Sequence, residues 1–182
     1  MLQSELIQSA TAGSRDLLIA LHGLGDSMAG YRFLPEVLRI PELNVLLVNA
    51  PDGYYGGFSW YDFATDPGPG VERSFRLLES LFNDLEAKGF PADRTILFGF
   101  SQGCLMSIET GLRYSRRLAG VIGVSGYVHE PDRLLGIKST VATEQEFLLT
   151  HGTRDTLIPL EPVRAQIDQL KRAGIRIEFH EF

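Results

Sequence analysis

Cysteine is almost absent from this sequence, since Cys104 is the only one among 182 residues. An internal disulfide is therefore excluded, and we expect a cytoplasmic protein, because disulfides stabilise mainly proteins of oxidising compartments. Residues 1–14 lack a basic segment followed by a continuous apolar stretch, so no signal peptide is predicted. No apolar run approaches the roughly 18 residues of a membrane helix, so no membrane span is predicted.

An excess of positive charge is also lacking. The chain has 17 Lys and Arg residues against 23 Asp and Glu residues, and its formal net charge is −6. Binding to a nucleic-acid backbone needs a basic face, so a nucleic-acid partner is not expected. The hydrophobic fraction of 44% and the length suit one domain with one sizeable core, over residues 1–182.

Short apolar runs alternate along the chain with longer amphipathic stretches. Strands are predicted for the runs 17–21, 45–48, 95–98, 118–124, 146–150 and 175–182. Helices are predicted where apolar residues recur at helical spacing, over 31–38, 71–88, 104–114 and 159–173. Because the central strands are apolar throughout, the order predicts an α/β fold whose mostly parallel sheet carries helices on both faces. Sites in such sheets lie at the carboxyl ends of strands.

Residues 99–103 have the sequence Gly-Phe-Ser-Gln-Gly and fit the pattern G-x-S-x-G. In α/β-hydrolases this pattern forms a strained turn between a strand and a helix that exposes the serine hydroxyl. A predicted strand enters the segment and a predicted helix leaves it, so Ser101 is the candidate nucleophile. The alternative is a tight turn with an incidental serine.

Residues 22–26, with the sequence His-Gly-Leu-Gly-Asp, follow the first predicted strand. Two glycines let the backbone approach a ligand closely, and an α/β-hydrolase takes one oxyanion donor from such a loop and one from the residue after the nucleophile. The predicted donors are the N–H groups of Leu24 and Gln102. The alternative is a glycine-rich connection without a catalytic role. We expect His22 to bond locally and Asp26 to be able to cap the next helix.

A serine nucleophile needs a general base, and the base needs an orienting carboxylate. Asp155 fits the carboxylate role, because it follows the predicted strand 146–150; the alternative is an N-cap for the helix near Pro159. The order Ser, Asp, His leaves His180 as the only histidine after Asp155. His180 lies inside an alternating strand, which makes it a poor base. His151 is out of order and is expected to be structural.

Four motifs occur in an order that resembles one known family. They are residues 22–26, Ser59-Trp60-Tyr61-Asp62, residues 99–103, and residues 151–159 with the sequence His-Gly-Thr-Arg-Asp-Thr-Leu-Ile-Pro. The chain resembles the phospholipase/carboxylesterase family of α/β-hydrolases, which includes acyl-protein thioesterases and small bacterial carboxylesterases, from about Leu17 to Phe182.

The resemblance implies hydrolysis of carboxylic esters or thioesters, an activity of the EC 3.1 class, through a Ser–Asp–His triad with no metal or cofactor. Ser101, Asp155 and the two donors carry over. The family's catalytic histidine lies on a loop past the strand matched here by 175–182, followed by a last helix. We therefore expect the true base beyond Phe182, the C-terminal part to be missing from these 182 residues, and a chain ending here to be nearly inactive with apolar sheet surface uncovered.

Aromatic residues crowd the glycine-rich stretch 54–63, which can form an apolar wall for an acyl chain or can pin the loop to the protein body. Trp60 is the first candidate for such a wall, with Phe58 beside it and Met28 at the rim. Cys104 is expected to pack beneath the helix that follows the 99–103 turn, a turn here called the elbow.

Three hypotheses about the function remain. The first is a serine hydrolase that acts on a small-molecule ester or thioester, as a monomer or a homodimer. The second is a non-catalytic α/β-hydrolase-fold protein that binds a ligand or partner. The third keeps the enzyme but makes it a peptidase or lactonase.

Overall fold

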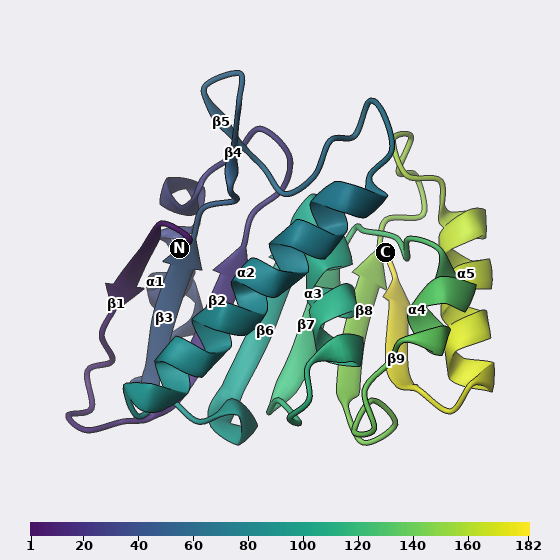
Figure 1. The fold of residues 1–182 in the computed structure, drawn as a ribbon. Coiled ribbons are helices and arrows are strands. Elements are labelled where there is room, and N and C mark those ends of the chain that lie inside the picture. Colours follow the sequence, from purple (N-terminus) through teal and green to yellow (C-terminus); the bar gives the residue numbers. More distant parts are fainter.

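The computed structural model describes all of residues 1–182 and is built around a seven-stranded sheet (Figure 1). In spatial order the strands are β1 (Ser4–Ile7), β3 (Leu43–Val48), β2 (Asp16–Leu21), β6 (Thr95–Phe100), β7 (Gly120–Val124), β8 (Glu146–His151) and β9 (Arg176–Glu181). Every neighbouring pair is parallel except β1 with β3. The predicted, mostly parallel sheet is confirmed. The sequence pattern missed β1, which is a short, half-exposed edge strand.

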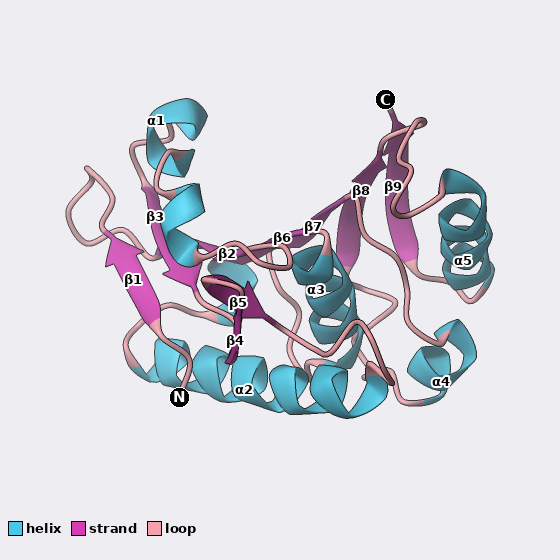
Figure 2. Cartoon of the chain, turned by 90° about the horizontal axis from the view of Figure 1, so that it is seen from above, coloured by secondary structure: helices cyan, strands magenta, loops and turns pink.

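Helices cover the two faces of the sheet unequally (Figure 2). The four helices on one face are α2 (Gly68–Ala87), α3 (Gln102–Arg113), α4 (Pro131–Gly136) and α5 (Leu160–Arg172). The other face carries only the short helix α1 (Leu34–Leu38) and the 3₁₀ turn η1 (Met28–Tyr31), while a second 3₁₀ turn, η2 (Ala92–Arg94), leads into β6. No helix combines the length and the apolar character that crossing a membrane requires.

The helix predicted over 31–38 is wrong in its bounds, because the structure divides this stretch into η1 and α1. Pro35 lies in the first turn of α1. Proline has no N–H to donate and its ring clashes with the turn before it, so a helix can begin just before Pro35 but cannot run through it from Tyr31.

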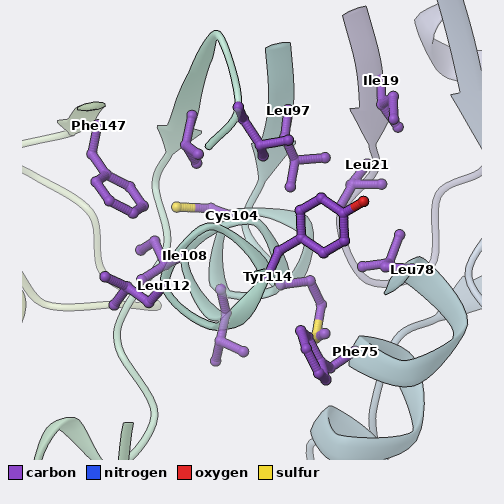
Figure 3. Packing of buried hydrophobic residues seen from close by; sticks show 14 of the residues in the cluster. Ile19, Leu21, Phe75, Leu78, Leu97, Cys104, Ile108, Leu112, Tyr114 and Phe147 are labelled. Atoms are coloured by element: carbon purple, nitrogen blue, oxygen red, sulfur yellow. The ribbon is translucent and has the colours of Figure 1, made fainter. Parts of the chain in front are cut away.

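Alternation along β2 divides the apolar residues between two cores. Leu17, Ile19 and Leu21 belong to the main core of 34 buried residues, on the side of α3. Leu18 and Ala20 face the smaller core beneath α1. In the main core, α3 lies between the sheet and α2 (Figure 3).

Cys104 packs beneath the elbow, on the sheet side of α3, as predicted (Figure 3). Burial raises the pKa of its thiol to about 12, so the sulfur is a neutral packing group and not a nucleophile.

A two-stranded hairpin stands at the carboxyl end of β3 (Figure 1). Its strands are β4 (Asp52–Tyr54) and β5 (Gly57–Ser59), and its two turn residues, Tyr55 and Gly56, both have positive φ, of 42° and 90°. Two positive φ angles are the signature of the type I′ turn, whose twist matches that of paired strands. The hairpin lies at the same edge of the sheet as the loops that follow β2, β6, β7 and β8.

Candidate active site

Ser101 occupies a strained turn between β6 and α3. Its φ and ψ are +52° and −114°, a conformation that non-glycine residues rarely adopt, and its N–H donates to the Val124 carbonyl at 2.9 Å. The two glycines of the motif are sterically required: a Cβ on Gly99 would lie 2.0 Å from the Gly103 oxygen, and one on Gly103 would lie 2.3 Å from the Leu21 oxygen. This is the geometry that G-x-S-x-G predicts.

Two N–H groups from separate turns lie beside Ser101. Leu24 and Gln102 line the same cavity as Ser101, and neither N–H donates in the hydrogen bonds that hold the turns and loops. Gln102 is the first residue of α3, whose first-turn N–H groups have no partner inside the helix and carry the positive end of its dipole. The arrangement can hold a negative oxygen that develops next to the serine.

His22 supports the first of these turns. Its Nδ1–H donates to the Gly23 carbonyl at 2.6 Å, and its Nε2 accepts from the Ala50 N–H at 3.0 Å. Burial lowers the pKa of the ring, which keeps it neutral and in this one tautomer. Because both nitrogens are engaged, His22 holds the loop and has no free nitrogen to take a proton.

Asp155 lies in the lining of the same cavity as Ser101. Its Oδ1 accepts from the N–H groups of Leu157 and Ile158, both at 2.9 Å, which fixes the carboxylate. Its Oδ2 accepts no hydrogen bond from the chain and is available to an incoming donor. The alternative of an N-cap is wrong, because α5 begins at Leu160 with Pro159 as its cap.

His151 lies next to this carboxylate but is already engaged. Its ring is buried, and Nε2 donates to the Ile158 carbonyl at 2.8 Å while lying 3.8 Å from Asp155 Oδ2. The ring therefore props the turn that presents Asp155, which agrees with the structural role expected for it.

The structure does not bring His180 to Ser101. His180 lies on β9, where its side chain is 57% exposed and its Nε2 bonds Glu178 Oε1 at 2.6 Å. It is not part of the cavity lining that contains Ser101 and Asp155. Because a strand directs alternate side chains to opposite faces, its position inside β9 turns its ring toward the open face of the sheet. His180 as the base is therefore contradicted by the geometry.

The cavity at Ser101 has a volume of about 530 Å³. Its wall is mainly apolar and comes from five segments of the chain, within residues 23–26, 61–63, 100–102, 125–127 and 155–158. The apolar and aromatic residues in it are Leu24, Tyr61, Phe63, Phe100, Tyr127, Leu157 and Ile158. Asp26 and Asp155 are the charged residues in the lining, so the cavity favours neutral, apolar groups over anionic ones.

The three residues predicted to contact substrate do not line this cavity. Trp60 is fully buried, because its indole points inward and donates to the His22 carbonyl at 2.9 Å. Phe58 packs against the core, and its main chain pairs with the Gly25–Asp26 turn. Met28 packs against the smaller core beneath α1. The prediction that this stretch supplies the wall was right for its neighbours Tyr61 and Phe63 instead.

Several lining residues were missed, although the sequence contained a signal for them. Tyr127 follows the carboxyl end of β7, which the rule for parallel sheets marks as a site position. Leu157 and Ile158 follow Asp155 by two and three residues, and Phe100 precedes the nucleophile. Phe100, Leu157 and Ile158 lie within three residues of a predicted site residue, whereas Tyr127 follows a strand for which no site residue was predicted.

Comparisons with known proteins agree with this geometry. A family model described as Phospholipase/Carboxylesterase matches residues 2–182. Acyl-protein thioesterase 1 of Yarrowia lipolytica is 36% identical over 166 residues, which are 82% of this chain and 73% of the relative. Acyl-protein thioesterase 1 of Schizosaccharomyces pombe is 33% identical over 171 residues, covering 87% and 76%. The crystal structure of esterase PE8 superposes with a TM-score of 0.88 at 28% identity and covers all of this chain and 88% of that one.

Proposed function

The chain belongs to the phospholipase/carboxylesterase family, and from that membership we propose how its residues divide the work of catalysis. It is a serine hydrolase that cleaves carboxylic ester or thioester bonds. The observation that carries the assignment of residues is the shared cavity: Ser101 on its strained turn, two N–H groups without partners, and the fixed carboxylate of Asp155 all line it.

The proposed reaction has two halves. The Ser101 hydroxyl attacks the carbonyl carbon as a base takes its proton, and the Leu24 and Gln102 N–H groups hold the oxygen that becomes negative. The leaving alcohol or thiol takes the proton from the base, which leaves an acyl group on Ser101. Water then repeats the sequence and releases the acid. Asp155 orients the base and stabilises its charged form.

We propose that the base is a histidine from outside residues 1–182. Two observations support this. None of the four histidines within the chain, His22, His129, His151 and His180, belongs to the lining of the cavity that contains Ser101. The main chain of Phe182 is bound to the loop that presents Asp155: its N–H donates to the His151 carbonyl at 3.1 Å, and its carbonyl accepts from the Thr153 N–H at 2.7 Å. A segment that continues from Phe182 starts beside the carboxylate.

The proposed substrates are thioesters and esters with an apolar acyl group, including S-acylated protein cysteines. The name of the fungal relatives, acyl-protein thioesterase, supports the thiol of a protein cysteine as the leaving group. The apolar wall of the cavity, with Phe63 65% and Leu157 90% exposed near Ser101, supports the acyl group. Exposed apolar side chains around a nucleophile stabilise a bound hydrocarbon chain, because binding removes both from water.

A fluorophosphonate probe tests the nucleophile. The full-length protein should be labelled on Ser101, and Ser101→Ala should abolish labelling. Ser125→Ala is the matched control, because Ser125 lines the same cavity and also has a positive φ, of 51°. We expect it to be labelled as the parent is. Absence of labelling in the parent protein would favour the non-catalytic binding protein instead.

Rates on a matched set of substrates test the class of bond. A short-chain ester, an S-acylated peptide, a lactone and a peptide amide should separate the readings, and we expect the ester and the thioester to be cleaved far faster than the amide. A preference for the amide or the lactone would support the peptidase or lactonase instead.

Location and assembly stay predictions. A cytoplasmic location is supported by the single, buried cysteine. Formation of a homodimer is supported by exposed apolar side chains around α1, at Phe33, Val37 and Ile40, and sedimentation of the purified protein checks it.

A further inference from the structure

The side chain of Gln102 has a buried, fully bonded carboxamide next to the nucleophile. Gln102 is 3% exposed. Its Oε1 accepts from the Trp60 N–H at 2.9 Å, and its Nε2 donates to the Tyr61 carbonyl at 2.9 Å. The orientation of the amide is fixed by these partners, because an N–H needs an acceptor and a carbonyl needs a donor. The hydroxyl of Ser59 lies within reach of the same group, 3.2 Å from Oε1.

Trp60 connects this carboxamide to the other side of the site. Its main chain is held by Gln102 on the elbow, while its indole N–H donates to the carbonyl of His22 at 2.9 Å. His22 begins the turn that carries Leu24. Trp60 is 0% exposed, so neither bond competes with water. A chain of two direct hydrogen bonds therefore links the elbow to the loop that faces it.

Further hydrogen bonds hold the segment around Trp60. The hydroxyl of Ser74 on α2 donates to the Trp60 carbonyl. The Gly25 N–H donates to the Phe58 carbonyl, and the Phe58 N–H donates to the Asp26 carbonyl, both at 2.9 Å. Residues 58–61 thus form a strut that contacts the first oxyanion turn, α2 and the elbow.

We propose that the Gln102 carboxamide is a positioning residue for catalysis: through Trp60 it sets the spacing between the Leu24 and Gln102 N–H groups. The proposal rests on the assignment of these two groups as oxyanion donors. A donor contributes fully only when it is 2.7–3.1 Å from the oxyanion. The carboxamide contacts no substrate, and it acts through the strut on where the two donors stand. It also fixes the main chain of Tyr61, a residue that lines the cavity.

The principal test compares Gln102→Met with Gln145→Met in the full-length protein. Methionine keeps the length of the side chain and removes both amide partners. Gln145 is a matched control: it is 1% exposed, and its Oε1 accepts from the Leu118 N–H at 2.8 Å, at the amino ends of the strands, away from Ser101. With a p-nitrophenyl ester, Gln102→Met should lower kcat by roughly ten- to a hundredfold with KM within about twofold. Gln145→Met should leave kcat unchanged.

Gln102→Glu supplies a signature that a purely structural role would not produce. A protonated carboxyl can donate to the Tyr61 carbonyl and accept from the Trp60 N–H, as the amide does, but an ionised one places an oxygen against the Tyr61 carbonyl. The ratio of its kcat to that of the parent should therefore fall as pH rises, by roughly tenfold between about pH 6 and pH 9, because burial raises the carboxyl pKa. The parent's own pH profile cancels in the ratio.

Trp60→Phe tests the second bond of the strut, since it removes the indole N–H and keeps a buried aromatic ring. We expect kcat to fall in the same direction as in Gln102→Met. This variant also serves if Gln102→Met does not fold.

The outcomes separate the inference from the function on which it rests. If the parent protein neither cleaves the ester nor reacts with a fluorophosphonate, the assignment of the Leu24 and Gln102 N–H groups as oxyanion donors is itself wrong. An active parent whose Gln102→Met or Trp60→Phe variant keeps kcat within twofold overturns the strut alone. Equal losses of kcat in the Gln102 and Gln145 variants, or a pH-independent ratio for Gln102→Glu, would also overturn it.

Discussion

Gly103→Ala is a one-atom test of how closely the elbow must approach the neighbouring strand. A Cβ at this position would stand 2.3 Å from the Leu21 oxygen and 2.8 Å from the His22 oxygen, both of them main-chain atoms that no rotamer change can move. Ordinary contact begins near 3.4 Å, so the start of α3 must withdraw from β2 by roughly 1 Å. The withdrawal moves the Gln102 N–H away from the loop that carries Leu24.

Two effects of this displacement can be measured. A misplacement of about 1 Å can cost a hundredfold in rate, so we expect kcat/KM on a short-chain ester to fall by roughly that factor. Forcing a methyl group into a filled site should lower the free energy of unfolding by about 1–3 kcal/mol. Thermal unfolding, followed by circular dichroism, and initial rates on the same preparation give the two numbers.

The matched control is Gly120→Ala at the start of β7. A Cβ there meets no atom within 4 Å, and the residue does not have a positive φ, so we expect unchanged activity and equal or slightly higher stability. A Gly103→Ala protein that keeps the parent's melting temperature and at least a third of its kcat/KM would refute the reasoning, because the elbow would then not need its close approach to Leu21.

Three further predictions follow from burial and contact. His180→Ala should keep kcat/KM within about twofold, because His180 lies outside the cavity. Asp155→Ala should lower kcat by about a thousandfold or more while the protein stays folded. An inactive His180→Ala protein would restore His180 as the base. Leu149→Ala should lower the free energy of unfolding, measured by urea titration, by about 2–5 kcal/mol, because Leu149 is 2% exposed. Leu148 lies on the opposite face and is 37% exposed, so Leu148→Ala should lower it by less than about 1 kcal/mol. Equal losses would contradict the assignment of faces. Cys104 should resist iodoacetamide in the folded protein up to about pH 9 and react once urea unfolds it, because burial raises its thiol pKa to about 12 and keeps the thiolate absent; rapid labelling of the folded protein would show the elbow to be open.

The central strands and the site loops could be predicted because local pattern and position dictate them. Runs such as 17–21 are short and apolar at every position, which is typical of a strand buried on both faces, and the glycines of the G-x-S-x-G turn are sterically required. The edge strand β1 was missed for the opposite reason. It is four residues long, alternates between exposed and half-buried, and is stabilised by pairing with β3, whose residues lie 38 to 44 positions later in the sequence, from Ile7↔Val45 to Ser4↔Val48.

The hairpin was missed because the first residue of its turn is of a type that seldom occupies this position. Type I′ turns favour Asn or Asp before glycine, and here Tyr55 takes the first position at a φ of 42°. The surrounding contacts override that preference: the β5 main chain pairs with Gly25 and Asp26, and a Cβ on Gly57 would lie 2.0 Å from the Gly25 oxygen. Such contacts join segments more than 30 residues apart, which single-sequence patterns do not register.

The same dependence on distant contacts explains why the prediction that Trp60 forms a wall of the cavity was wrong. An aromatic residue next to a glycine-rich stretch at the carboxyl end of a strand is equally compatible with a wall and with an anchor. Which role applies depends on whether a buried acceptor awaits the indole N–H, and that acceptor, the His22 carbonyl, lies 38 residues earlier. Once Trp60 is an anchor, the motif around it serves two separate ends: its buried part, with Gln102, fixes where the oxyanion stands, while Tyr61 and Phe63 face what is bound. Changes of substrate can therefore arise at Phe63, which is 65% exposed, without altering the geometry that stabilises the transition state, because Phe63 takes no part in the hydrogen bonds of Trp60 and Gln102.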